Sequence, residues 1–166
     1  MAKNTALYFR NFVFGVEDSL VSTVGLLSGI AIADTPRETI ILSGVVLIFV
    51  EAFSMGVGSF LSEDAADELV EKKKFQINSI YASIIMFFSY FISGYIPLFP
   101  YLLFETQIAF GFSIILSLIT LFLLGALSAK YFKRSVFRLG LKMLILGGIA
   151  VALGTLVGNY VHQASL

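Results

Sequence analysis

The chain has 166 residues, of which 58% are hydrophobic and 13% are charged, and its mean hydropathy is +0.93. Because a soluble globular domain carries roughly a quarter charged residues, this composition excludes an ordinary soluble domain. The formal net charge is zero, which by itself says nothing about partners, and we expect no nucleic-acid partner for a membrane protein. Cysteine is absent, so we expect no disulfide and no thiolate metal site.

Five hydrophobic runs are each about the length needed to cross a hydrocarbon core ~30 Å thick. They lie at about residues 12–33, 40–61, 77–99, 107–129 and 139–161. The first run is too long for a signal-peptide core and contains two acids, so we expect it to be retained. The runs leave no room for a second domain and predict an all-α integral membrane protein, with residues 1–166 forming one five-helix transmembrane domain.

Lys and Arg are distributed unevenly between the two sides that five spans define. The side with the N-terminus carries Lys3, Arg10, Lys72, Lys73, Lys74, Lys130, Lys133, Arg134, Arg138 and Lys142. The opposite side carries only Arg37. Because cytoplasmic loops are rich in Lys and Arg, we predict a cytoplasmic N-terminus and a C-terminus, with His162, on the far side. We expect His162 to be an interfacial residue.

Local signals predict where the helices begin and end. Pro36 is placed to start the second helix, and Pro97 and Pro100 are predicted to end the third. The segment 62–76 has no Gly or Pro, so it should extend the second helix beyond the membrane. Three small-xxx-small pairs favour close helix packing: Gly25 with Gly29, Ser54 with Gly58, and Gly154 with Gly158.

Acidic side chains occur inside only two of the five runs. Glu17 and Asp18 lie in the first and Glu51 near the middle of the second. A carboxylate in hydrocarbon costs several kcal/mol unless it faces a partner, a cavity or an ion, and is therefore a functional candidate.

Helical spacing places these acids on polar, small-residue stripes that should face protein or water. The first stripe is Asn11, Gly15, Asp18, Ser22, Gly25 and Gly29, and the second is Gly44, Glu51, Met55, Gly58 and Ser62. At ~1.5 Å per residue, Asp18 and Met55 each lie about 10 Å from the same membrane surface. Carboxylate oxygens beside a thioether favour Fe²⁺ or its neighbours over Mg²⁺ or Ca²⁺. We therefore predict a metal site that includes Asp18, Met55, Glu51 and Glu17.

Each of these residues also has a structural interpretation. Met55 alone is more often a packing residue, and Glu51 is equally explained as a buried acid bonded to Ser or Asn. Asp18 could cap a helix break at Gly15, and Glu17 could snorkel or pair with Arg10. The combination favours a site more than any single member does.

A run of acids follows the second hydrophobic segment. It contains Glu63, Asp64, Asp67, Glu68 and Glu71. The simpler interpretation is a solvated helix face supported by an i, i+4 pair from Glu68 to Lys72. The alternative is a cytosolic entry point that collects metal ions.

Two motifs resemble those of the vacuolar iron transporter (VIT) family. Residues 13–22 resemble its first-helix Gly-x-x-Asp-Gly motif, and residues 54–62 its second-helix Ser-Met-x-x-Gly-Glu-Tyr-x-Ser motif. The last span, with Gly148, Ala152, Thr155 and Gly158, resembles the small-residue fifth helix of the family. The resemblance implies a homodimer with an ion path at the subunit interface, lined by helices one and two. It also implies export of Fe²⁺ or Mn²⁺ from the cytosol in exchange for protons, with metal contacts at Asp18 and Met55.

The chain departs from the family pattern in four places. Ser59 stands where the family has Glu, and Ser19 where it has Gly. Glu51 occupies a position that is typically small and apolar, and it could compensate for the acid missing at Ser59. The long Glu-rich insertion that plant and fungal members carry between spans two and three is replaced here by the short 62–76 connection.

Together these features predict a divalent-metal/proton antiporter in which Asp18 and Glu51 couple the two fluxes. Fe²⁺ or Mn²⁺ is its substrate, and we expect no permanently bound cofactor. Such a protein would lie in the cell membrane of a prokaryote or a vacuolar-type membrane of a eukaryote. The alternative is a non-transporting membrane interaction or scaffold protein whose buried acids fix helix association. An enzyme is not expected, because the chain has no Ser/His or Asp/Asp pair at a suitable depth.

Overall fold

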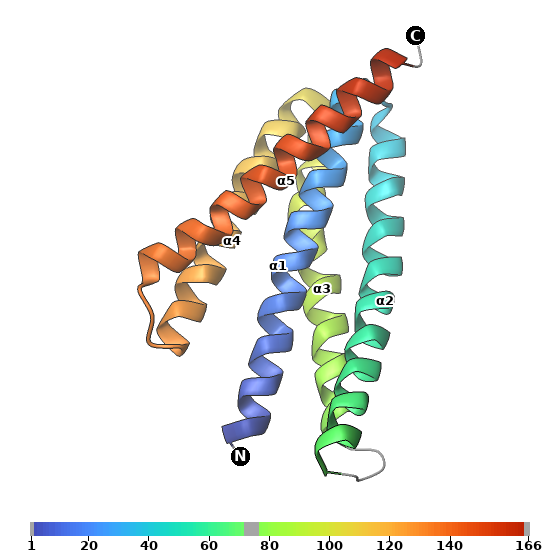
Figure 1. Ribbon diagram of the computed structural model, residues 1–166. Helices are drawn as coiled ribbons and strands as arrows, with labels where there is room; N and C mark the ends of the chain where they lie inside the picture. Colours follow the sequence, from blue (N-terminus) through green and yellow to red (C-terminus); the bar gives the residue numbers. More distant parts are fainter. Residues whose placement is uncertain (1, 72–76, 165–166) are drawn as a thin grey trace.

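Five long α-helices make up the computed structural model, which describes residues 2–71 and 77–164 (Figure 1). The side chains of residues 2–3 and 67–71 lie outside that description. The helices are α1 (Ala2–Ile32), α2 (Arg37–Glu71), α3 (Ile77–Leu103), α4 (Thr106–Tyr131) and α5 (Val136–Ala164). All five are long and apolar enough to cross a membrane, and the described residues include no strand. The predicted all-α membrane fold is therefore confirmed.

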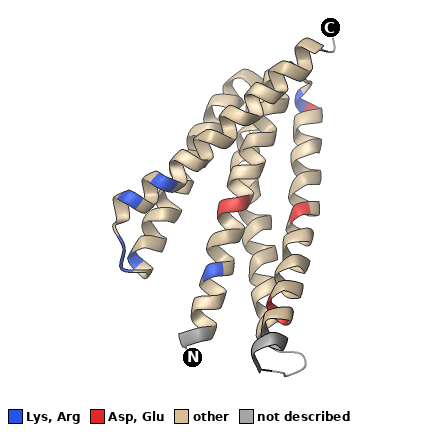
Figure 2. Cartoon of the chain, viewed as in Figure 1, with Lys and Arg blue, Asp and Glu red and all other residues tan. Residues whose placement is uncertain are grey.

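The helices form a three-helix layer and a hairpin. α3 packs extensively against both α1 and α2, whereas α1 and α2 contact each other less. The α4–α5 hairpin lies on the other side of α1, and α5 crosses α1 obliquely (Figure 1). The N-terminal end of α1, the C-terminal end of α2 and the α4–α5 turn all lie toward one end of the molecule. The charged side chains concentrate near the helix ends, apart from acids midway along α1 and α2 (Figure 2).

Large apolar side chains cover much of the outer surface as well as filling the interior. The core holds fully buried residues such as Leu27, Ile48 and Leu98. Large apolar side chains also point outward, including Phe53 at 66% exposure and Leu127 at 67%. A soluble protein would not expose contiguous apolar surface on this scale, but lipid-facing helices do.

α1 and α5 cross with their backbones in direct contact. A Cβ atom added at Gly154 would overlap the carbonyl oxygen of Gly25, and one added at Gly158 would overlap that of Gly29. Two of the three predicted small-residue pairs thus pack against each other within one chain. In contrast, Ser54 and Gly58 are exposed on α2.

The prediction that Pro97 and Pro100 end the third helix is wrong. α3 continues to Leu103 with both prolines inside it. Each ring removes one backbone donor, but both rings are buried in the bundle. The Pro97 carbonyl also accepts a 2.7 Å hydrogen bond from the Ser113 hydroxyl of α4. Packing therefore holds the last turns of the helix together.

The turn between α1 and α2 places Arg37 against the end of α3. Pro36 precedes α2 as predicted, and its carbonyl accepts hydrogen bonds from the Thr39 and Ile40 amides. Arg37 donates from Nε to the Tyr101 carbonyl at 2.7 Å and from Nη2 to the Leu102 carbonyl at 2.8 Å. Carbonyls in the last turn of a helix lack intrahelical partners, so Arg37 caps α3.

Replacing Arg37 with Ala should lower the free energy of unfolding by about 1–2 kcal/mol, because two charge-assisted hydrogen bonds are lost. Thermal unfolding of the purified protein in detergent measures the effect. Glu38→Ala is the matched control, since Glu38 is an exposed neighbour on the same turn. Equal melting temperatures for the two variants would show that the cap contributes nothing.

Candidate functional site

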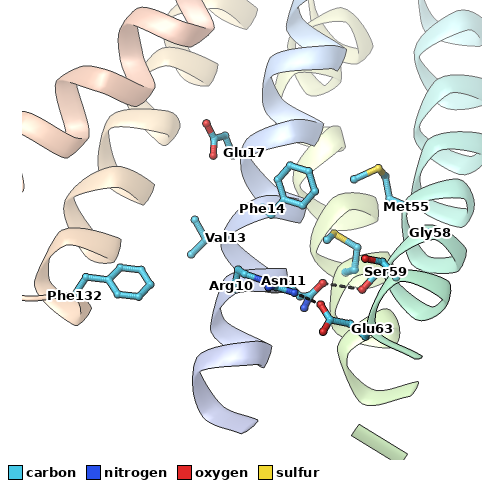
Figure 3. Close-up of a pocket in the computed structure, with 12 residues that line it drawn as sticks. Arg10, Asn11, Val13, Phe14, Glu17, Met55, Gly58, Ser59, Glu63 and Phe132 are labelled. Carbon is cyan, nitrogen blue, oxygen red and sulfur yellow. Dashed lines mark hydrogen bonds and ion pairs between the residues drawn. The ribbon is translucent and has the colours of Figure 1, made fainter. Parts of the chain in front are cut away.

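A cavity of about 610 Å³ opens between the N-terminal half of α1 and the C-terminal half of α2 (Figure 3). Met86 of α3 and Phe132, just beyond α4, complete its walls. The polar and sulfur-bearing side chains that line it include Arg10, Asn11, Glu17, Met55, Ser59, Ser62 and Glu63. The cavity therefore lies beside those segments of the two stripes that are predicted to be nearer the cytoplasm.

Two contacts between α1 and α2 cross this cavity. The Ser59 hydroxyl donates a 2.7 Å hydrogen bond to Oδ1 of Asn11, and Arg10 forms an ion pair with Glu63 (Figure 3). Asn11 is 3% exposed, and its Nδ2 donates to the Leu7 carbonyl at 3.0 Å. Its rotamer is therefore fixed from two sides. Sequence analysis noted Ser59 only as a departure from the family, although its i+4 spacing from Met55 places both on one face.

Glu17 points away from α2. Its side chain lies on the α4–α5 side of α1, whereas Met55 lies on the opposite side (Figure 3). The carboxylate is within electrostatic range of Lys142 at the start of α5. The interpretation that Glu17 pairs with Arg10 is wrong, because Arg10 pairs with Glu63. A role for Glu17 in binding metal stays a prediction.

Asp18 and Glu51 approach each other across α1 and α2. Their carboxylates are within electrostatic range of one another, and each is half-buried. Like charges in a low-dielectric region repel each other. Protonation of one carboxyl group or a nearby cation would relieve this repulsion.

Tyr90 of α3 joins this pair of acids, a residue that sequence analysis missed. Tyr90 is fully buried, its hydroxyl lies 2.7 Å from that of Ser22, and it is within electrostatic range of both Asp18 and Glu51. Ser19 donates a 2.7 Å hydrogen bond to the Tyr90 carbonyl and so ties α1 to α3. Among 17 Phe and 7 Tyr residues, nothing in the sequence distinguishes Tyr90.

Acidic side chains do not cluster into a three-ligand group among the described residues of one chain. Within the part of the chain that the structure describes, no three His, Cys, Asp or Glu side chains group closely enough to hold a metal ion. The candidates on one chain are the Asp18–Glu51 pair and Met55 in the adjoining cavity.

The acidic extension of the second helix is present. α2 continues to Glu71, as the lack of Gly and Pro predicts. Glu63 is paired with Arg10, and Asp64 is half-buried. The side chains of Asp67, Glu68 and Glu71 lie outside the described residues, so metal entry along this segment stays a prediction.

The model of the VIT family matches residues 9–77 and 64–159. The chain belongs to the VIT family. The matched residues include α2, α3 and α4 and most of α1 and α5, and the resemblance to the family is confirmed. No curated protein matches the chain.

Membership of the VIT family, together with five apolar helices, establishes a multi-pass integral membrane protein of a metal-ion transporter family. Family membership also relates the two sequence motifs to the acid pair and the cavity. The family's first-helix motif, residues 13–22, contains Asp18 of the acid pair, and the second-helix motif, residues 54–62, contains Met55 of the cavity. In this VIT-family chain, the two motifs thus lie on the two helices that enclose the cavity.

Proposed function

We propose that this protein moves Fe²⁺ or Mn²⁺ out of the cytosol in exchange for protons. The observation that carries the proposal is the approach of Asp18 to Glu51 beside a cavity that contains Met55. The cavity is at the end of the helices where the Lys and Arg residues gather, which is the predicted cytoplasmic side. A metal ion entering there would meet Met55 and then the acid pair.

Competition between protons and metal supplies the coupling. Burial in a low-dielectric region favours the neutral form of a carboxyl group, whereas a bound divalent cation favours the ionised form. The Asp18–Glu51 pair would hold a proton when no metal is present and release it when metal binds.

The thioether favours a transition metal. Met55 is the sulfur-bearing residue of the second-helix motif, and Met86 of α3 also lines the cavity. Thioether sulfur is a poor ligand for Mg²⁺ and Ca²⁺, which prefer oxygen alone. This donor set supports Fe²⁺ or Mn²⁺ as the substrate.

A homodimer would complete the donor set. The described residues of one chain bring no three acidic ligands together, and the α2 face next to Met55 exposes Ser54 and Gly58. Small residues allow close helix approach within a membrane. A second copy placed against α1 and α2 would bring another Asp18, Glu51 and Met55 to the same path.

Transport assays in proteoliposomes test this function. We expect Fe²⁺ entry to quench a trapped metal-sensitive dye, an imposed proton gradient to accelerate entry several-fold, and protons to move the opposite way. Protein-free liposomes and liposomes supplied with Mg²⁺ are the controls. Fe²⁺ entry no faster than in protein-free liposomes would contradict transport. Entry without proton movement would contradict antiport.

A further inference from the structure

The turn between α4 and α5 gathers positive charge that the proposed transport does not use. Four cations lie within nine residues, Lys130, Lys133, Arg134 and Arg138, and all four are exposed. We name these four residues the basic turn. No acidic residue follows Glu105 in the sequence. Among the described residues, no ion pair involves any member of the basic turn.

The helix ends at this turn add to its positive character. The C-terminus of α4 is closed by its own cap, in which the Phe132 amide donates to the Ser128 carbonyl at 3.0 Å and the Arg134 amide to the Ala129 carbonyl at 2.8 Å. Lys133 adopts a left-handed conformation (φ 52°) within this cap. The first turn of α5 contains no acidic residue. Its amides therefore remain as the positive end of a long helix, a position that attracts phosphate groups.

Aromatic contacts place the basic turn at the boundary of the membrane span. Phe9 of α1 stacks on Tyr131 at 4.0 Å between ring centroids and meets Phe132 edge-on at 5.5 Å. Phe9 precedes Arg10, which lies at the mouth of the cavity. Tyr131 is 45% exposed, Phe132 48% and Phe137 69%. Exposed aromatic rings at the end of a hydrophobic span are typical of residues at the lipid headgroup level.

The basic turn is separate from the acids of the molecule. Several Lys and Arg residues lie at the α4–α5 hairpin, whereas the mid-helix acidic residues lie on α1 and α2 (Figure 2). Lys142, the next cation along α5, lies within electrostatic range of Glu17. The four cations of the basic turn thus face the surroundings of the protein and not an internal partner.

We propose that the basic turn binds the phosphate groups of anionic phospholipids in the leaflet that it faces. Four exposed cations, the N-terminal amides of α5 and three interfacial aromatic rings match a negatively charged headgroup above an apolar chain. The exposed apolar residues of α5, such as Leu141 and Ile145, continue from the turn and would contact the acyl chains. On the predicted topology, this leaflet is the cytoplasmic one, where clustered Lys and Arg attract anionic lipids.

Lipid titration of the full-length protein in detergent, followed by native mass spectrometry, tests the proposal. We expect phosphatidylglycerol to bind at least about tenfold more tightly than phosphatidylcholine, a difference of ~1.4 kcal/mol. The triple variant Lys130→Gln, Arg134→Gln, Arg138→Gln should lose this preference. The matched variant Lys72→Gln, Lys73→Gln, Lys74→Gln removes the same charge from another segment and should keep it.

Three results would overturn the proposal. The first is equal binding of phosphatidylglycerol and phosphatidylcholine by wild-type protein. The second is an equal loss of the preference for phosphatidylglycerol in both triple variants. The third is displacement of phosphatidylglycerol by millimolar inorganic phosphate. If the variant of Lys130, Arg134 and Arg138 does not elute as a folded species, a salt titration of the wild-type protein tests the proposal instead. The preference for phosphatidylglycerol should then fall as ionic strength rises, and a salt-independent preference would contradict an electrostatic headgroup site.

Discussion

Replacing Asp18 with Asn should reduce Fe²⁺ flux into proteoliposomes by at least about tenfold, equivalent to a loss of ~1.4 kcal/mol. The substitution preserves the size of the side chain and removes its negative charge, which interacts with the charge of Glu51 across α1 and α2. A neutral amide neither competes for a proton nor balances a divalent cation. Initial rates of dye quenching at a fixed proton gradient measure the effect.

The matched control for this substitution is Asp34→Asn. Asp34 is exposed in the α1–α2 turn with φ 53°, a conformation that Asn also tolerates. Flux through this variant should equal that of wild-type protein. Normal flux through Asp18→Asn would remove the proposed site. Weakened dimerisation of Asp18→Asn, with no metal binding by wild-type protein, would support the alternative of a non-transporting interaction protein.

Replacing Gly154 with Ala should lower the free energy of unfolding by about 3 kcal/mol, the upper end for an overpacked site. The added methyl group would meet the carbonyl of Gly25, and neither backbone can rotate away as a side chain would. For a chain of this size, the melting temperature should fall by roughly 6–12 °C. Thermal unfolding in detergent measures the change.

Gly148→Ala is the matched control, because Gly148 lies on the same helix but away from the contact between α1 and α5. Nothing lies within 4 Å of a Cβ atom at Gly148, and Ala is favoured over Gly in a helix by up to ~1 kcal/mol. This variant should be as stable as wild-type protein or slightly more stable. Similar melting temperatures for Gly154→Ala and Gly148→Ala would mean that α1 and α5 do not pack as the structure has them.

The acids illustrate how far sequence reasoning extends to the site. Helical spacing placed Asp18 and Ser22 on one face of α1, and both lie in the polar cluster around Tyr90. Spacing could not show that Glu17, one residue earlier, lies within electrostatic range of Lys142. The position of α5 depends on contacts between glycines far apart in the sequence. The partners of Arg10 and Asn11 depend in the same way on how α2 lies against α1.

The sequence by itself determined the class of protein, the number of spans, their approximate bounds and the family. These features depend on local composition and periodicity, because each span must satisfy its backbone hydrogen bonds internally within hydrocarbon. Only the tertiary structure decided that Gly25 and Gly29 meet Gly154 and Gly158 inside one chain, and that Tyr90 adjoins the two acids. The tertiary structure also allows α3 to continue beyond Pro97 and Pro100, because packing against neighbouring helices compensates for the lost backbone hydrogen bonds. The partner of each helix face is set by the sum of all contacts, and a single helix does not encode it.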